Sequence, residues 1–165
     1  MRGICATVLC LAAFAAFAAA EDAARLRAAD KARLAAAYGR CVARIDRPAE
    51  GVVVPVENHP DGSVKMDVSA EKAQFFDREG LVWCGGVVLR EYAADGTLKM
   101  ELAAEGCVID RKTKSGWMAG RAKGRYGETE VAGSDIWFSA ENEAVEIGSG
   151  VEITSAGIRL EGLKL

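Results

Sequence analysis

Histidine is almost missing from this chain, which has one, His59, in 165 residues. His59 lies in the stretch Asn-His-Pro-Asp-Gly, which is typical of a turn, and no histidine or cysteine stands near it at the spacing of metal ligands. The five cysteines include no Cys-x-x-Cys pair. We therefore expect neither a metal site nor a cofactor.

Signatures of catalysis are missing as well. The sequence contains no Gly-x-Ser-x-Gly elbow, no His-Glu-x-x-His, no phosphate-binding loop and no Gly-x-Gly-x-x-Gly. Acidic residues are plentiful, but most alternate with apolar residues, as on the solvated face of a strand. A glycosidase needs only two carboxylates, yet nothing in the sequence singles out a pair. We expect a protein that is not an enzyme.

Long hydrophobic runs are confined to residues 1–20. A basic start, Met1-Arg2-Gly3, precedes the apolar run from Ile4 to Phe17, and three alanines follow at 18–20. This layout is typical of a cleavable secretory signal and predicts export to the periplasm. The alternative is an uncleaved inner-membrane anchor, for which the 17 residues from Ile4 to Ala20 are short.

Positive charge is scarce beyond residue 47. Residues 21–47 carry a net charge of +3, whereas residues 48–165 carry −7. The acidic balance of the longer part gives no support for nucleic-acid binding. The basic segment is suited either to contact with anionic lipid or, as is commoner, to a solvated helix face.

Residues 21–47 are predicted to form an N-terminal helix, with the helical pattern running over 22–46. The segment is rich in Ala, Leu and Arg, and proline first occurs at Pro48. Its apolar residues form a loose stripe, which either packs on the chain's own domain or binds a partner. The members of the stripe are Leu26, Leu34, Tyr38, Cys41, Val42 and Ile45.

An internal repeat dominates the rest of the chain. Asp61–Glu71 reads DGSVKMDVSAE and Asp95–Glu105 reads DGTLKMELAAE, at an offset of 34 residues. At the same offset Trp83 matches Trp117 and Gly86 matches Gly120. Weaker copies begin at 131 and 158. A fixed period indicates one supersecondary unit used several times, here with Asp-Gly hairpin turns.

Apolar and charged residues alternate after each turn, which predicts strands with one apolar and one solvated face. We expect residues 48–165 to form an all-β domain in which two sheets stack around an apolar interior. Gly148–Gly150 is interpreted as a turn between two short strands. The face expected to line the interior consists of Met66, Val68, Leu98, Met100, Leu102, Ile109, Ile136, Phe138, Val151 and Ile153.

Three tryptophans and three cysteines outside residues 1–20 leave alternatives open. Trp83 and Trp117 either fill the same gap in successive repeats or contact a sugar or lipid. Trp137 is out of phase with its neighbours and faces solvent, a partner or the helix. Cys84 and Cys107 are the first pair to test for a disulfide, the alternative being that they are small buried apolar side chains.

One family shares these patterns. The run from Asp95 to Asp110, the glycines of 116–120, and the closing runs 150–153 and 157–163 resemble the LptC and LptA (OstA-like) group of periplasmic lipopolysaccharide-transport proteins. The resemblance covers about residues 50–165. It implies a repeat-built β-jellyroll, or taco-like sheet stack, that holds lipid acyl chains between its sheets and joins neighbouring OstA-like proteins edge to edge.

The resemblance and the alternating strands together predict a carrier or bridge component of lipopolysaccharide transport. The interior face defined above would bind the acyl chains of lipopolysaccharide or a related lipid. The last strand would form the partner edge by strand addition, through Ile158, Leu160 and Leu163. The alternative is a non-catalytic structural or interaction protein of the cell envelope, with a closed core and a blunted edge.

Overall fold

The computed structural model describes the backbone of residues 4–155 and 158–163 and the side chains of residues 21–155. The chain divides into two compact units, Met1–Arg33 and Leu34–Leu165. Helix α1 (Ile4–Val42) contributes to both, and its last turns, from Leu34, belong to the second unit. The second unit contains the whole β-domain.

Helix α1 ends four residues before the predicted limit of residue 46. The amide of Arg44 donates to the carbonyl of Cys41 at 2.9 Å, an i to i−3 bond that tightens the last turn. The amide of Asp46 then donates to Oε1 of Gln74 at 3.0 Å. A side chain of the sheet therefore satisfies a backbone donor that a longer helix would have used internally.

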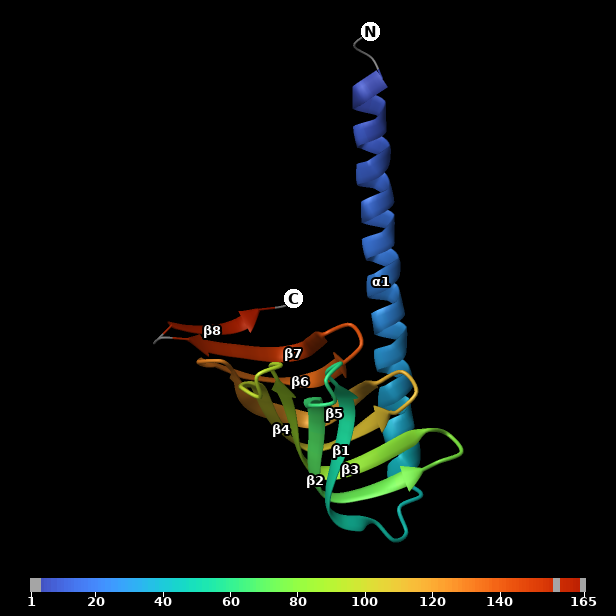
Figure 1. Cartoon of the computed structure of the whole chain (residues 1–165), viewed down its shortest axis with the longest axis vertical. Coiled ribbons are helices and arrows are strands. Elements are labelled where there is room, and N and C mark those ends of the chain that lie inside the picture. The colour runs from blue at the N-terminus through green and yellow to red at the C-terminus, as the bar shows by residue number, and fades with distance from the viewer. Residues whose placement is uncertain (1–3, 156–157, 164–165) are drawn as a thin grey trace. The chain divides into compact units, whose positions relative to one another are not determined.

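Eight antiparallel strands follow and form one sheet in the sequential order β1 to β8 (Figure 1). This confirms the predicted all-β domain with an N-terminal helix. β1 and β8 form the two edges, and Pro55 lies on β1 beside a register shift, as expected of an edge strand. The strands are β1 (Ala49–Asn58), β2 (Val64–Phe76), β3 (Leu81–Tyr92), β4 (Leu98–Asp110), β5 (Ser115–Tyr126), β6 (Thr129–Ser139), β7 (Ala144–Ser155) and β8 (Ile158–Leu163).

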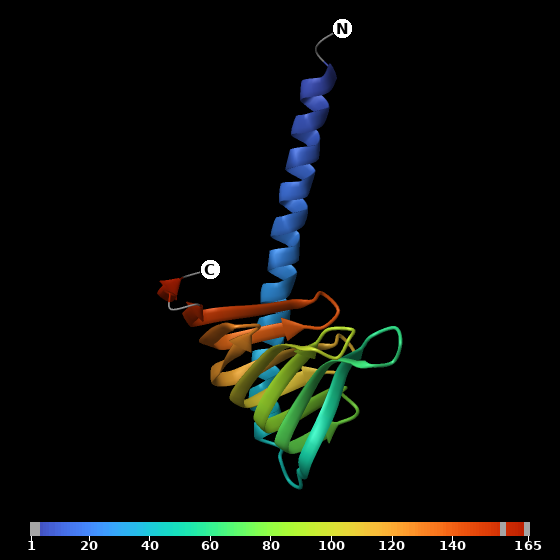
Figure 2. The ribbon, with the colours of Figure 1, turned by 60° about the vertical axis from the view of Figure 1, so that its left-hand side comes forward.

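A crease crosses the middle of this sheet. Each odd-numbered strand from β1 to β7 has a glycine with positive φ: Gly51 (61°) is the third residue of β1, and Gly86 (59°), Gly120 (74°) and Gly150 (59°) lie near the centres of β3, β5 and β7. The ladder pairs Ala70 with Val87 and Lys72 with Gly85, which leaves Glu71 opposite Gly86 without a bridge. Strands with a residue in this conformation bend sharply, and the bent ribbons can be followed in Figure 2.

The crease divides the sheet into two leaves. The helix-side leaf consists of the strand halves 72–76, 81–85, 106–110, 115–119, 135–139 and 144–149. The far leaf consists of the strand halves 52–58, 64–70, 87–92, 98–104, 121–126, 129–133 and 151–155. The two stacked layers predicted from the sequence are therefore halves of one continuous sheet, and each of β2 to β7 contributes to both.

The interpretation of Gly148–Gly150 as a turn is wrong. These residues lie inside β7, at the crease, because the backbone bends there without leaving the sheet. The Asp-Gly turns, in contrast, are confirmed. Gly62 and Gly96 lie in the connections before β2 and β4, with φ of 88° and 83°.

The outer faces of the two leaves differ. The helix-side leaf is covered by the end of α1, where Leu34, Ala37 and Cys41 are each at most 1% exposed. The far leaf presents a charged row of directly opposite residues across five strands. The row runs Asp67, Arg90, Glu101, Arg125 and Glu130. Arg90 and Glu101 form an ion pair within this row, and such opposite charges at paired positions stabilise the register.

Candidate functional site

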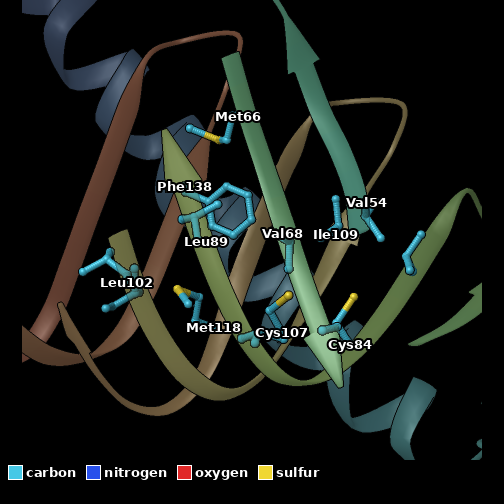
Figure 3. Close-up of a cluster of buried hydrophobic side chains, with 14 of the residues drawn as sticks. Val54, Met66, Val68, Cys84, Leu89, Leu102, Cys107, Ile109, Met118 and Phe138 are labelled. Carbon is cyan, nitrogen blue, oxygen red and sulfur yellow. The ribbon is translucent and has the colours of Figure 1, made fainter. Parts of the chain in front are cut away.

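The space between the two leaves is apolar and filled by side chains (Figure 3). We call this set the interior cluster. Its buried members come from β1 to β6 and the following turn: Val54, Met66, Val68, Ala70, Ala73, Val82, Cys84, Val87, Leu89, Met100, Leu102, Cys107, Ile109, Met118, Ala122, Ile136, Phe138 and Ala140. Residues from both leaves contribute, so the cluster holds the folded sheet together.

Seven of the ten residues expected to line the interior belong to this cluster: Met66, Val68, Met100, Leu102, Ile109, Ile136 and Phe138. Val151 is also buried, at 3% exposure, whereas Leu98 and Ile153 are half-buried. The structure therefore brings most of the predicted set together, at positions up to 72 residues apart in the chain.

The lining predicted from the sequence left out the other eleven buried members of the interior cluster. Val82 and Cys84 face inward on one side of the crease, and Val87 and Leu89 do so on the other. The inward positions change from even to odd numbers within β3, because two successive residues face outward at the bend. Gly85-Gly86 was the available signal, since glycine inside an apolar strand pattern marks a bulge or bend.

The predicted partner edge is β8, which pairs only with β7 and forms the last position in the sheet. Ile158 pairs with Ser155 and Leu160 with Ile153. The side chains of Ile158, Leu160 and Leu163 lie outside the described residues. An edge strand has unpaired backbone groups that another strand could pair with, so the position of β8 is compatible with docking. The docking role itself stays a prediction.

The margin of the leaves opposite the crease is polar; we call it the rim. A cavity of about 590 Å³ lies at the rim, lined by Glu57, Asn58, His59, Pro60, Lys65, Glu91, Tyr92, Ala93, Ala94, Lys99 and Glu143. A second cavity, of about 320 Å³, shares Glu91, Lys99 and Glu143 and reaches Met100 and Val145. The rim therefore joins solvent-exposed charges to the edge of the interior.

Ion pairs cross the rim between the leaves. Nζ of Lys65 on β2 lies 2.5 Å from Oε1 of Glu143, in the turn between β6 and β7. Nζ of Lys114, in the turn between β4 and β5, lies 2.8 Å from Oε2 of Glu57 on β1. Hydrogen bonds from these ammonium groups lower the pKa of Glu143 and of Glu57. The side chain of Lys65 is only 18% exposed, although it lies on the charged face of β2.

His59 is a turn residue with a structural partner. Its Nε2 lies 3.1 Å from the carbonyl oxygen of Tyr92, which links the first and second Asp-Gly turns. Among the side chains that the structure describes, no group of three or more histidine, cysteine or acidic residues is placed to hold a metal ion.

Cys84 and Cys107 are directly opposite each other on β3 and β4, and both are fully buried. Both thiols are free, and a disulfide between them stays a prediction. The hydrogen bond with Cys84 and burial together raise the pKa of the Cys107 thiol well above its ordinary value. Because the thiolate is the reactive form, the raised pKa makes the buried Cys107 thiol unreactive.

The tryptophans pack beside α1. Trp137 is 2% exposed and packs with Leu34 and Cys41 of α1. Of the three predicted neighbours of Trp137, namely solvent, a partner and the helix, the structure shows the helix. Trp83 and Trp117 pack against the same cluster from equivalent positions of β3 and β5. They fill matching gaps in the two repeats.

A search of the described residues for a helix with the length and hydropathy of a bilayer span found none. Comparisons of the whole chain with protein-family models and with curated proteins gave no match. The arrangement that these residues build is thus an apolar interior between two leaves, bordered by a charged rim.

Proposed function

We propose that this protein binds lipid acyl chains between its two leaves, as a carrier or bridge component of lipopolysaccharide transport in the periplasm. The observation that supports the proposal is the interior cluster, which is apolar throughout and continuous across both leaves. Burial of an acyl chain gains about 0.8 kcal/mol per methylene group and needs no directional polar contact. An interior built from aliphatic side chains suits such a ligand.

Part of the interior on β6 and β7 is only partly buried. Val145 and Ile147 on β7, and Val131 on β6, pack against the cluster yet are only partly buried. Apolar side chains that remain partly exposed next to a continuous core offer a surface on which a hydrocarbon chain gains contact. This side of the interior, close to Ile153, is where we place the bound acyl chain.

Association with other OstA-like proteins belongs to the same proposal. β1 is a poor docking edge, because Pro55 has no amide hydrogen and the neighbouring register shifts disrupt the strand. β8 occupies the opposite edge of the sheet and is the better template for an added strand. A proline in place of Arg159 should weaken such association, measured by co-purification, while leaving the thermal unfolding midpoint nearly unchanged.

The second candidate function is a non-catalytic structural or interaction protein of the envelope. The dense filling of the interior favours it, since Phe138, Leu89 and Val82 are each 0% exposed. In that case the interior is a closed core with no capacity for a ligand.

Photo-crosslinking separates the two functions. A benzophenone side chain at Ile153, which faces the interior, should capture lipopolysaccharide or a related lipid in cells. The same side chain at the neighbouring Glu152 provides the matched control, because Glu152 lines the charged outer face of the far leaf. A second benzophenone at Phe138 tests the centre of the interior cluster. If the side chains at 153 and 138 both capture only protein, we would reject lipid transport in favour of the structural function.

A further inference from the structure

The two leaves are joined differently at their two margins. At the crease each of β2 to β7 passes from one leaf to the other through covalent backbone. Along the rest of the sheet, all ladder pairing is between strands that are neighbours in sequence. The leaves therefore face each other through side chains, and at the rim these side chains are charged.

The rim contacts are weak compared with the rest of the fold. Each ion pair has one exposed partner, Glu143 at 65% or Lys114 at 45%, so water screens both pairs although Lys65 and Glu57 are only 18% and 20% exposed. Exposed pairs of this kind contribute little to stability, whereas a ladder joins strands by a hydrogen bond at almost every second residue. Separating the leaves at the rim thus breaks fewer hydrogen bonds than separating any two adjacent strands.

The interior has no room for an acyl chain while its side chains occupy it. Met66 and Met100 lie at the rim end of the cluster and are 2% and 4% exposed. The cavity of about 320 Å³ reaches Met100 from the rim and is bordered by Glu91, Lys99 and Glu143. An amphiphile would meet charged groups first and methionine behind them, an order that matches a polar headgroup followed by hydrocarbon.

We infer that the rim is the opening through which the interior is reached, with Lys65–Glu143 and Lys114–Glu57 holding the leaves together and the glycine crease acting as the hinge. The inference rests on the proposed binding of acyl chains. It differs from access past β8, because it requires the two leaves to separate at the margin opposite the bend. Glycines with left-handed backbone geometry are suited to absorb that motion.

The test locks the rim chemically. Lys65→Cys and Glu143→Cys are combined, and the two thiols are joined by a short bismaleimide. Cis-parinaric acid, a fluorescent fatty acid, then reports uptake by stopped flow. We expect the lock to slow uptake by about tenfold or more. Cys41, Cys84 and Cys107 are buried, and the native protein, the unlinked double variant and each single variant receive the same reagent as controls.

A matched control lock joins two residues of one leaf. Arg90 and Glu101 also form an ion pair, with 2.9 Å between Nε and Oε2, but both lie on the far leaf. Arg90→Cys and Glu101→Cys joined by the same reagent should leave the uptake rate unchanged. Loosening the rim should act in the opposite direction, so Lys65→Gln should raise the rate by about two- to fivefold, the range expected for one exposed ion pair.

The outcomes separate the two levels of the argument. Uptake that is equally fast with the rim locked and unlocked overturns the rim as the opening and leaves acyl-chain binding in place. Equal slowing by the rim lock and the control lock also overturns it, because general rigidity would then be the cause. If the native protein takes up no cis-parinaric acid, the proposed function and the rim inference both fail.

Discussion

Replacing the crease glycines by alanine gives a graded test of the bent sheet. Gly51, Gly86 and Gly120 have φ values of 61°, 59° and 74°, so an added Cβ is strained at all three. The surroundings differ. A Cβ at Gly51 meets nothing within 4 Å, one at Gly120 lies 3.1 Å from Cδ of Glu105, and one at Gly86 lies 2.6 Å from Cδ of Glu71.

The expected costs follow from these distances. A left-handed alanine costs about 1–2 kcal/mol, offset by up to about 1 kcal/mol because alanine restricts the unfolded chain. We therefore expect about 1 kcal/mol for Gly51→Ala. Gly86→Ala must also displace Glu71 from its rotamer, which adds about 0.5–1.5 kcal/mol. Its total should be about 2 kcal/mol, with Gly120→Ala between the two.

Urea unfolding followed by tryptophan fluorescence measures these costs. The double variant Gly86→Ala, Glu71→Ala removes the obstructing carboxylate and should return the cost of the glycine change to that of Gly51→Ala. Three equal costs would show that the glutamates do not lie over the glycines. A largest cost at Gly51 would refute the account of the crease altogether.

Three further predictions concern single side chains. Met66→Ala should lower the free energy of unfolding in urea by about 2–5 kcal/mol because it empties a buried site. Lys65→Ala should lower it by less than about 1 kcal/mol because the Glu143 side of its ion pair is exposed to water, and equal costs would contradict the assigned faces. Burial raises the pKa of Asp67, and its buried Oδ1 has no hydrogen-bond partner. The ionised side chain therefore destabilises the fold at pH values above the folded-state pKa, and this penalty disappears as the pH falls through that pKa toward the unfolded value. Asp67→Asn should therefore stabilise the protein at about pH 7 and lose that advantage near pH 3, and a gain that is equal at both pH values would count against it. Trp117→Phe should lower the thermal unfolding midpoint more than Trp83→Phe, because the indole of Trp117 donates a 2.8 Å hydrogen bond to Asp135 and the buried indole nitrogen of Trp83 has no partner. A larger decrease for Trp83→Phe would contradict this geometry.

The repeat made much of the β-domain predictable. The offset of 34 residues placed the Asp-Gly turns before β2 and β4, and alternation placed Met66 and Met100 in the interior, as the structure has them. These features depend on neighbours in the sequence. Turn chemistry and strand alternation act over a few residues, so one sequence is sufficient to predict them.

The crease and the rim could not be derived in the same way. The sequence does not distinguish a glycine in the turn between two strands, such as Gly96, from one that bends a strand, such as Gly150. The choice depends on packing between the leaves. The pair Lys65–Glu143 joins residues 78 positions apart, and nothing local in the sequence relates them. The rim became visible only with the three-dimensional fold.

Because the strands pair in sequential order, the cross-section and the length of the interior depend on different features of the chain. Its cross-section depends on the distance from the crease to the turns, which is fixed by the length of the half-strands within each repeat. Its length depends on how many hairpins the chain contains, because each 34-residue unit adds one pair of strands and pairs only with its neighbours. Duplication of such a unit would extend the interior without altering its width, so the length and the cross-section of this architecture evolve independently.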